Sequence, residues 1–327
     1  MRRALLIVCA LTAAAAADTP ASAPAPKLER TPVTPAPGMI ERARLEIQPG
    51  GRAIKQLAIE NPLGNVKVEG YDGTSIMIET RKQAPDEEGL ERLRVSLVPN
   101  PDGTVRITTT ADGGKEFKNV SRANMRIDLI IRAPRDARIE AAVSAGSLEV
   151  INMDAGGDLD TASGPISVRN VSGGVSTHSV SGATSLTQVF GSVDAQTISS
   201  NVDLDTIGGE RLIASASRGK IAGRRVRARH IELTTTDGAI TLEGESALRG
   251  RIVVASLRGD VDVRLRRQGA VTIRARGAKV NLGSATPFAR TQQDGWVHSQ
   301  LGQLGKTAPA FVELRSRYGM VQFAIIE

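Results

Sequence analysis

Ser163-Gly-Pro-Ile-Ser-Val168 is one copy of a short phrase that recurs through the second half of the chain. Each copy reads small residue, Gly or Ser, any residue, aliphatic residue, any residue, aliphatic residue. Alternation with period two is typical of a half-buried β-strand, and a constant repeat length indicates that every copy forms the same structural unit. The Gly or Ser position falls 18 residues apart in four copies and then at spacings of 19, 19, 21 and 19, at Gly146, Gly164, Gly182, Ser200, Gly219, Gly238, Gly259 and Ala278.

Two more aliphatic rows keep the same spacing. Side chains that recur once per turn stack in a column, with about 4.8 Å between neighbouring strands. Aromatic residues make up 2% of the chain, which suits a narrow interior. The sequence therefore predicts an all-β fold, a single-stranded β-solenoid similar to a β-helix, with turns of 18–19 residues. The rows are Val175, Val193, Leu212, Ile231, Ile252 and Val271, and Met153, Val171, Val189, Ile207 and Val226, with Leu248 predicted to continue the second.

Three other folds fit part of this pattern. A disordered Ser- and Gly-rich segment would not keep three rows in phase. A flat sandwich of hairpins would also place two strands in 18–19 residues, but the constant phase favours a coil. A left-handed hexapeptide helix needs an aliphatic residue at about every sixth position, and Ile166, Val168, Val171 and Val175 do not follow that spacing.

Residues 41–140 differ from the repeats and are predicted to form a β-rich N-terminal part. Asn61-Pro-Leu-Gly-Asn-Val-Lys-Val68 matches the phrase, which predicts a first turn there. Residues 93–98 and 104–110 alternate as strands, and the Pro and Gly residues between them predict a hairpin. Residues 141–327 are predicted to hold the solenoid repeats and a C-terminal aromatic cap that closes the open end, formed by Phe288, Trp296, Phe311, Tyr318 and Phe323.

Residues 1–17 are predicted to be a signal peptide. Arg2 and Arg3 precede an apolar run that is too short to span a bilayer, and small residues follow it. Residues 18–40 are rich in Pro and Ala and are predicted to be a linker. Cys9, the only cysteine, lies inside the predicted signal, so the mature chain would contain no disulfide and no thiol. These features predict export to the periplasm, the outer membrane or the cell surface, with no transmembrane span in the mature chain.

Several segments resemble a known family. Residues 126–134 and 137–150, with the train of Ser-Gly-x-Ile-x-Val phrases, are similar to the adhesin-like family of domain of unknown function 4097. Residues 61–66 are similar to that family's opening, and the resemblance covers residues 43–327. It implies a β-solenoid, a bacterial envelope protein and an adhesive or scaffolding role, and it implies no catalytic residue. Ser200-Asn201 and Ala278-Lys279 depart from the phrase, which puts the corner geometry there in doubt.

The titratable residues form no pattern typical of catalysis or metal binding. His178, His230 and His298 are far apart in the sequence. Asp158-Leu-Asp160 and Asp203-Leu-Asp205 each place two carboxylates on one strand face. Stacked turns could join such pairs in a calcium site, but the calcium-binding nonapeptide repeat is absent, which favours solvated acidic faces. We therefore predict no enzymatic activity, no cofactor and no metal.

Charge is distributed unevenly along the repeats. Residues 140–209 hold eight acids and one arginine, a net charge of −7, whereas residues 210–279 hold sixteen Lys or Arg and seven acids, a net charge of +9. If turns stack in sequence order, the basic half offers a contact surface for an anionic partner, such as anionic lipid or glycan, and a general contribution of these charges to solubility explains them equally well. Nucleic acid is a poor candidate because stacking aromatic residues are scarce. The residues selected for this contact are Arg224, Arg225, Arg227, Arg229, Arg264, Arg266 and Arg267.

These observations predict a non-enzymatic, exported envelope protein, an adhesin-like or scaffold β-solenoid with an unknown envelope or cell-surface partner. Two alternatives remain open at this point. One is a carbohydrate-active β-helix enzyme, which would need acid and base side chains from adjacent turns to converge in one groove. The other is a sensor or partner-binding domain for envelope stress.

Overall fold

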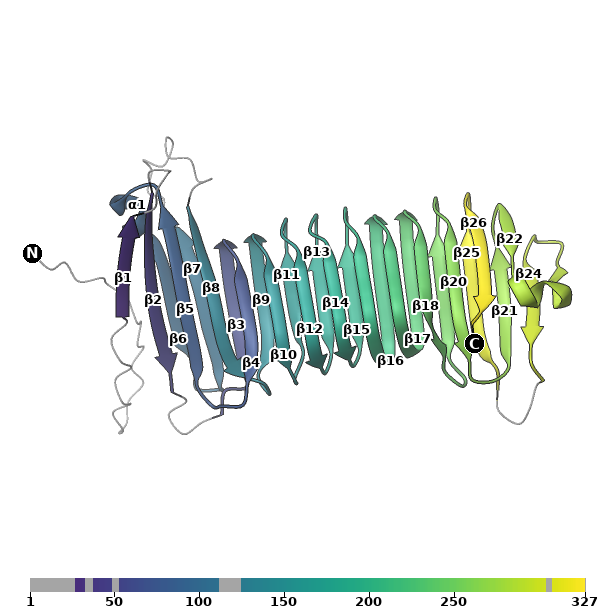
Figure 1. Ribbon diagram of the computed structural model, residues 1–327, viewed down its shortest axis with the longest axis horizontal. Helices are drawn as coiled ribbons and strands as arrows, with labels where there is room; N and C mark the ends of the chain where they lie inside the picture. The colour runs from purple at the N-terminus through teal and green to yellow at the C-terminus, as the bar shows by residue number, and fades with distance from the viewer. Residues whose placement is uncertain (1–26, 33–37, 49–52, 112–124, 304–307, 327) are drawn as a thin grey trace, which may run out of the picture. The chain divides into compact units, whose positions relative to one another are not determined.

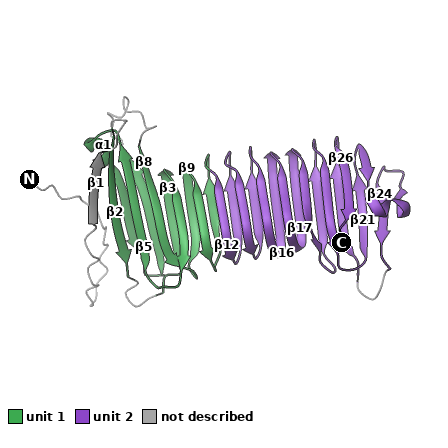
Figure 2. Ribbon diagram, viewed as in Figure 1, with its two compact units in different colours: residues 1–164 green, residues 165–327 purple. Residues whose placement is uncertain are grey.

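The structure of the protein is a computed structural model that describes residues 27–32, 38–48, 53–111, 125–303 and 308–326 (Figure 1). The predicted signal peptide lies outside these residues. The described chain is almost entirely β, which confirms the predicted fold class. It forms two compact units, residues 1–164 and 165–327, here called the N-terminal and C-terminal units (Figure 2).

The N-terminal unit contains eleven strands and one short helix among the residues described. They are β1 (Lys27–Pro32), β2 (Met39–Ile47), β3 (Gln56–Leu63), β4 (Val66–Tyr71), β5 (Ile76–Ala84), α1 (Glu87–Arg92), β6 (Leu93–Pro99), β7 (Thr104–Ala111), β8 (Arg126–Pro134), β9 (Arg138–Ala145), β10 (Leu148–Met153) and β11 (Gly157–Thr161).

The turn formed by β3 and β4 lies between two turns that follow it in sequence. β3 pairs in parallel with β7 on one side and β9 on the other, and β4 pairs in parallel with β8 and β10. The predicted turn at residues 61–68 therefore exists, but it is not the outermost turn of this unit. The predicted hairpin is confirmed, because β6 and β7 pair in antiparallel register.

Antiparallel strands complete one side of this unit. β5 pairs with β8 and β2, and β1 pairs with β2. β1 lies within the predicted linker, so residues 27–32 form a strand there. The five residues before Pro32 contain no proline, so their N–H groups can pair with an edge strand. Between β2 and β5, Lys82 Nζ lies 3.0 Å from Glu41 Oε1, and both side chains are buried.

The C-terminal unit is a coil of parallel strands. Its described elements are β12 (Ile166–Ser172), β13 (Val175–Ser179), β14 (Thr184–Phe190), β15 (Val193–Thr197), β16 (Val202–Arg218), β17 (Ile221–Asp237), β18 (Ile240–Ser246), β19 (Arg251–Ser256), β20 (Val261–Arg267), β21 (Val271–Arg276), β22 (Lys279–Asn281), the 3-10 helix η3 (Gly283–Phe288), β23 (Arg290–Thr291), β24 (Val297–Leu301), β25 (Ala310–Ser316) and β26 (Met320–Ile325).

The predicted aliphatic rows form the core of this unit. Val175 pairs with Val193, and Val193 pairs with Leu212, so equivalent side chains stack in register. Every residue of the row from Val175 to Val271 is buried. Leu248 is the exception to the other row and is 53% exposed. The register shifts between β17 and β18, where Gly244 pairs with Val226, and this shift moves Leu248 out of the column.

Corners repeat as regularly as the strands. Asn170, Gln188, Thr206 and Arg225 have φ between 51° and 58° in four successive turns, so one left-handed residue bends each turn at the same place. At another corner, backbones approach closely enough to exclude a side chain. A Cβ on Gly259 would lie 1.9 Å from the carbonyl oxygen of Gly238.

At its C-terminal end the coil does not follow sequence order. β25 lies between β19 and β21, and β26 lies between β20 and β22. Sequence-order stacking, assumed in the charge argument, is therefore wrong here. β24 covers the other side of β21 in antiparallel register. Of the five aromatic residues of the predicted cap, Phe323 is buried in β26, whereas Phe288 and Tyr318 are more than 60% exposed.

Candidate functional site

The seven arginines that the sequence selects lie in two strands of the C-terminal unit. Four belong to β17 and three to β20, and β18 lies between these strands. All seven side chains are exposed. The strands bring them to one side of the coil, but in two groups.

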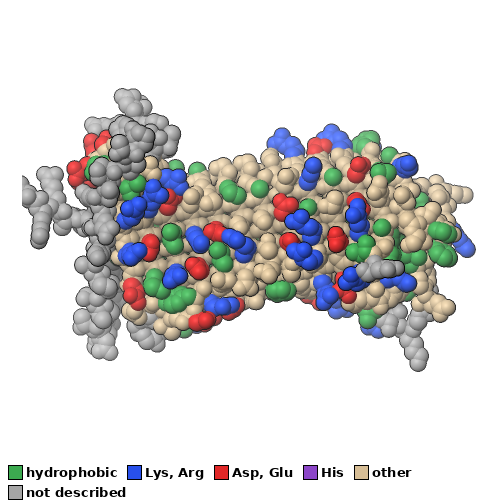
Figure 3. Space-filling view, in the orientation of Figure 1, with side chains coloured by type: hydrophobic (Ala, Val, Ile, Leu, Met, Phe, Trp, Pro, Cys, Tyr) green, Lys and Arg blue, Asp and Glu red, His purple; other side chains and the backbone are tan. Residues whose placement is uncertain are grey.

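Most of these arginines contact a carboxylate of their own turn or a neighbouring one. Figure 3 shows basic and acidic side chains next to each other on the face in view. Such exposed pairs stabilise the fold little, but they reduce the free positive charge. The predicted basic half is thus largely a network of ion pairs. The pairs are Arg225 with Asp205, Arg224 with Asp205 (3.8 Å), Arg227 with Glu245, Arg229 with Glu210 (3.4 Å) and Arg264 with Asp262 (2.9 Å).

Arg225, Arg227 and Arg266 line a groove with a volume of about 850 Å³. The groove follows one outward position from turn to turn. Phe190 pairs with Gly208, and Gly208 pairs with Arg227. In the following strands this position is occupied by Glu245, Arg266 and Ile326.

The groove exists because glycines interrupt a column of side chains. Gly208 carries no side chain, and a Cβ there would lie 3.0 Å from the ring of Phe190. In the next column, a Cβ on Gly209 would lie 2.2 Å from the carbonyl oxygen of Gly191. The hollow is therefore walled by Phe190, which is 52% exposed, and by charged side chains beyond the glycines.

Glu245 is the best-connected acid of this groove. A hydrogen bond from Gln268 and the nearby guanidinium groups of Arg227 and Arg266 lower its pKa, although partial burial opposes that shift. Glu245 is consequently an anion at neutral pH. The groove offers apolar contact at Phe190 and Ile326 and charged contact between them, which suits binding.

The other residues considered for chemistry do not converge. In the residues that the structure describes, no group of three or more His, Cys, Asp or Glu could hold a metal ion. Asp158 pairs with Arg138 at 2.8 Å, and Asp205 pairs with Arg225, so one carboxylate of each acidic pair is engaged by an arginine. His230 Nε2 lies 3.8 Å from Glu210 Oε1 on an exposed surface.

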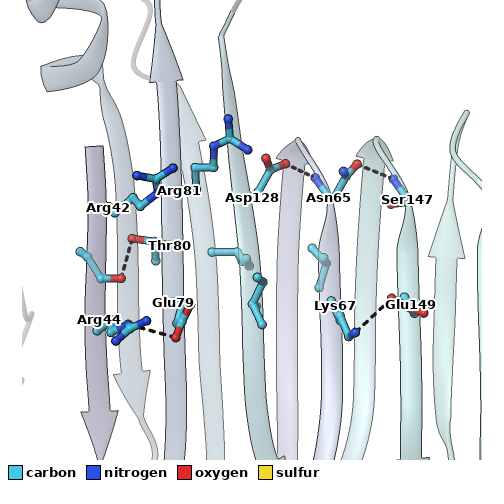
Figure 4. A pocket seen from close by; sticks show the side chains of 14 residues that line it. Arg42, Arg44, Asn65, Lys67, Glu79, Thr80, Arg81, Asp128, Ser147 and Glu149 are labelled. Carbon is cyan, nitrogen blue, oxygen red and sulfur yellow. Dashed lines mark hydrogen bonds and ion pairs between the residues drawn. The ribbon is translucent and has the colours of Figure 1, made fainter. Parts of the chain in front are cut away.

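A second groove, of about 540 Å³, lies in the N-terminal unit (Figure 4). It crosses β2, β5, β8, β4 and β10. Arg44 pairs with Glu79 at 3.0 Å and Lys67 with Glu149 at 3.7 Å. Sequence reasoning missed this site, because antiparallel pairing of β2 with β5 and of β5 with β8 brings strands from outside the repeat next to the parallel strands β8, β4 and β10.

Comparison with protein families matches residues 54–282 to a family described as Toastrack DUF4097. The match covers well over half of the chain. The chain belongs to the Toastrack DUF4097 family. The family was therefore correctly identified from the phrases at residues 126–150 and from Ser163–Val168. No curated protein matches this Toastrack chain in sequence.

Several solved structures resemble this Toastrack protein at low identity. A “putative cell adhesion protein” from Clostridium sporogenes shares 14% identity and covers 92% of this chain and 100% of its own, with a TM-score of 0.26. A “putative lipid binding protein” from Parabacteroides distasonis shares 11% and covers 88% and 97%, with a TM-score of 0.44. A “putative adhesin” from Bacteroides fragilis shares 11% and covers 87% and 97%, with a TM-score of 0.34. These values are too low to transfer a function.

Proposed function

We propose that this Toastrack protein is an exported, non-enzymatic envelope protein with an adhesin-like or scaffolding role, and that it binds an anionic partner through the groove of the C-terminal unit. One observation carries the proposal: glycines open a hollow in a rigid ladder, and Arg225, Arg227 and Arg266 line it beside Phe190. A ladder of paired strands holds these groups at fixed spacing. That arrangement favours recognition of an extended ligand.

Export rests on the sequence at residues 1–17 and on the family resemblance. No helix in the described part of the chain is both long enough and apolar enough to cross a membrane. Cell fractionation of the full chain, and of a chain lacking residues 1–17, tests export. We expect the full chain outside the cytoplasm and the shortened chain inside it. Retention of the full chain in the cytoplasm would contradict the proposal.

Binding is tested with phosphatidylglycerol vesicles and phosphatidylcholine vesicles at low and high salt. We expect binding to phosphatidylglycerol alone, weakened by salt because the contact is electrostatic. The double variant Arg225→Gln with Arg227→Gln should bind more weakly by up to about 10-fold, since an arginine near an anionic surface contributes roughly 1 kcal/mol and the pairs with Asp205 and Glu245 offset part of that contribution.

Arg264→Gln is the matched control, because Arg264 is exposed in the same sheet but does not line the groove. A second arm replaces the vesicles with polygalacturonate, an acidic glycan. Failure of both ligands at low salt, or an equal loss for Arg264→Gln and the double variant, would refute the assignment of the groove.

A carbohydrate-active enzyme is the second candidate, because acid and base side chains of adjacent turns do converge in this groove. Glycoside hydrolysis needs one carboxyl group that stays protonated, with a raised pKa. The surroundings of Glu245 lower its pKa instead. Release of reducing sugar from a panel of polysaccharides, abolished by Glu245→Gln, would favour the enzyme over the binding protein.

A further inference from the structure

Two arginines face each other across the groove of the N-terminal unit. Antiparallel pairing of β2 with β5 places Arg42 directly opposite Arg81, and both side chains are exposed. Like charges directly opposite each other destabilise a sheet. Two positions further along the same ladder, Arg44 faces Glu79 and pairs with it at 3.0 Å. The facing pair Arg44–Glu79 has opposite charges, whereas the facing pair Arg42–Arg81 has like charges, as Figure 4 shows.

The acid opposite Arg81 is engaged by other partners. Asp128 lies opposite Arg81 on β8, but its Oδ1 accepts hydrogen bonds from Arg126 Nη2 at 2.7 Å and from the backbone N–H of Asn65 at 2.9 Å. Among the side chains that the structure describes, Arg42 and Arg81 form no ion pair. Backbone pairing places Glu29 of β1 opposite Arg42 of β2, on the side of β2 that faces away from Arg81.

Both arginines line the groove of about 540 Å³, so a ligand there can reach them together. Ala43 and Val66, which are buried, also line the groove, and Ile130, which is 47% exposed, offers an apolar contact there. The paired charges Arg44–Glu79 and Lys67–Glu149 cancel each other. Among the described side chains, the guanidinium groups of Arg42 and Arg81 are therefore the two positive charges of this groove that have no ion-pair partner, and one small ligand can reach both.

We propose that this groove binds a phosphomonoester, with the Arg42 and Arg81 guanidinium groups donating to its phosphate oxygens. A phosphomonoester carries about −1.5 to −2 charges at neutral pH, so it neutralises both arginines, whereas a carboxylate or a phosphodiester neutralises one. The guanidinium fork matches tetrahedral phosphate geometry. Ile130 contacts the organic part of the ester. The site lies in the N-terminal unit and does not depend on the proposed groove in the C-terminal unit.

Calorimetric titration of the full chain with glycerol 1-phosphate tests the site, with sulfate and acetate as competitors. We expect binding in which Arg42→Gln and Arg81→Gln each lower the affinity about 10-fold or more, as for the loss of a charge-assisted hydrogen bond. Arg44→Gln removes a paired arginine from the same strand and should lower it less than threefold. Arg276→Gln should have no effect, because Arg276 faces Arg315 in a second like-charged rung that does not line this groove.

Thermal unfolding separates a binding role from a structural one. Glycerol 1-phosphate should raise the Tm of the wild-type protein and of Arg276→Gln, but not that of Arg81→Gln. Without ligand, Arg81→Gln should unfold at the same temperature as the wild type or higher, because it removes a repulsion. A lower Tm for this variant without ligand would contradict the uncompensated pair.

Vesicles distinguish a lipid source from a soluble one. Phosphatidic acid displays a phosphomonoester, and phosphatidylglycerol at equal density displays a diester. Preference for phosphatidic acid that disappears in Arg81→Gln supports the site and assigns it to a lipid, whereas binding of glycerol 1-phosphate without that preference supports a soluble ester. The proposal is overturned if neither ligand binds at millimolar concentration, if acetate, which carries one negative charge, binds as tightly as the ester, or if Arg44→Gln weakens binding as much as Arg81→Gln does.

Discussion

Gly238→Ala tests whether close stacking of backbones at the corners holds the coil together. A Cβ at Gly238 would lie 1.9 Å from the carbonyl oxygen of Gly219 and 2.6 Å from its carbonyl carbon. Neither atom belongs to a flexible side chain, so the two turns must separate by about 1 Å or more to restore a normal contact. The Gly219 carbonyl also accepts a hydrogen bond from Thr235 Oγ1 at 3.1 Å, which that movement would strain.

The expected cost combines overpacking and a weakened hydrogen bond. Overpacking costs roughly 1–3 kcal/mol, and a hydrogen bond contributes about 1 kcal/mol. We therefore expect Gly238→Ala to lower the free energy of unfolding by about 2–4 kcal/mol. Ser200 occupies the equivalent corner position two turns earlier, so a side chain is tolerated at that position in at least one turn. The prediction therefore depends on the short distance at Gly238 alone.

Urea unfolding followed by circular dichroism measures this change, and hydrogen exchange locates it. Protection should fall most in β17 and β18, because each turn of a repeat protein contacts mainly its neighbours. Gly174→Ala is the control, since the nearest atom to its Cβ would be the Ser192 carbonyl oxygen at 3.7 Å, an ordinary contact. This control should change stability by less than about 0.5 kcal/mol or raise it slightly. Equal unfolding midpoints for the two variants would refute the argument from backbone clearance.

Three further predictions concern other parts of the structure. Lys82→Met should cost about 3–5 kcal/mol in urea unfolding because it removes the buried ammonium group that pairs with Glu41 at 3.0 Å, and adding Glu41→Leu should recover most of that loss. Deletion of residues 310–327 should expose the edges of β19 and β21 and cause aggregation, and a peptide of residues 308–327 added during refolding should restore the elution volume of the intact protein on gel filtration. The lowered pKa of Glu245 stabilises the folded state above the ordinary pKa of 4.5, and this stability is lost as pH falls through the lowered value. Glu245→Gln should therefore lose less stability than the wild type in urea unfolding repeated across that acidic range.

The interior of the coil could be predicted from sequence because it depends on spacing alone. An aliphatic residue that recurs once per turn must fall at the same point of each turn, and Val175, Val193 and Leu212 do so. Leu248 shows the limit of this reasoning. Spacing cannot show that the register shifts at Gly244, so an apolar residue at a suitable distance was placed inside although it is exposed.

The sites were less predictable because residues that form a cluster of like charge in the sequence are paired with opposite charges from other strands in the fold. Arg225 and Arg227 form part of a basic run in sequence, yet Asp205 and Glu245 on adjacent strands pair with them. The parallel ladder creates those contacts between residues about twenty positions apart. The groove depends on Gly208, which pairs with Phe190 on one neighbouring strand and with Arg227 on the other. In the sequence, the feature that indicates the groove is therefore a glycine at a repeat position where the neighbouring turns carry large side chains.

The order of turns at the C-terminal end could not follow from the repeat itself. Every turn presents the same ladder of N–H and C=O groups and the same buried columns, so β21 could pair with β19 as readily as with β25. The two possible strand orders are distinguished by β24, which pairs with one edge of β21. The other edge of β21 is then left for β25, and β26 pairs with β22. Residues 310–316 fill the slot between β19 and β21, and they thereby cover two parallel edges that would otherwise attract other strands. The C-terminal strands therefore complete the core from within the coil, and the elements from β22 to β24 form its end.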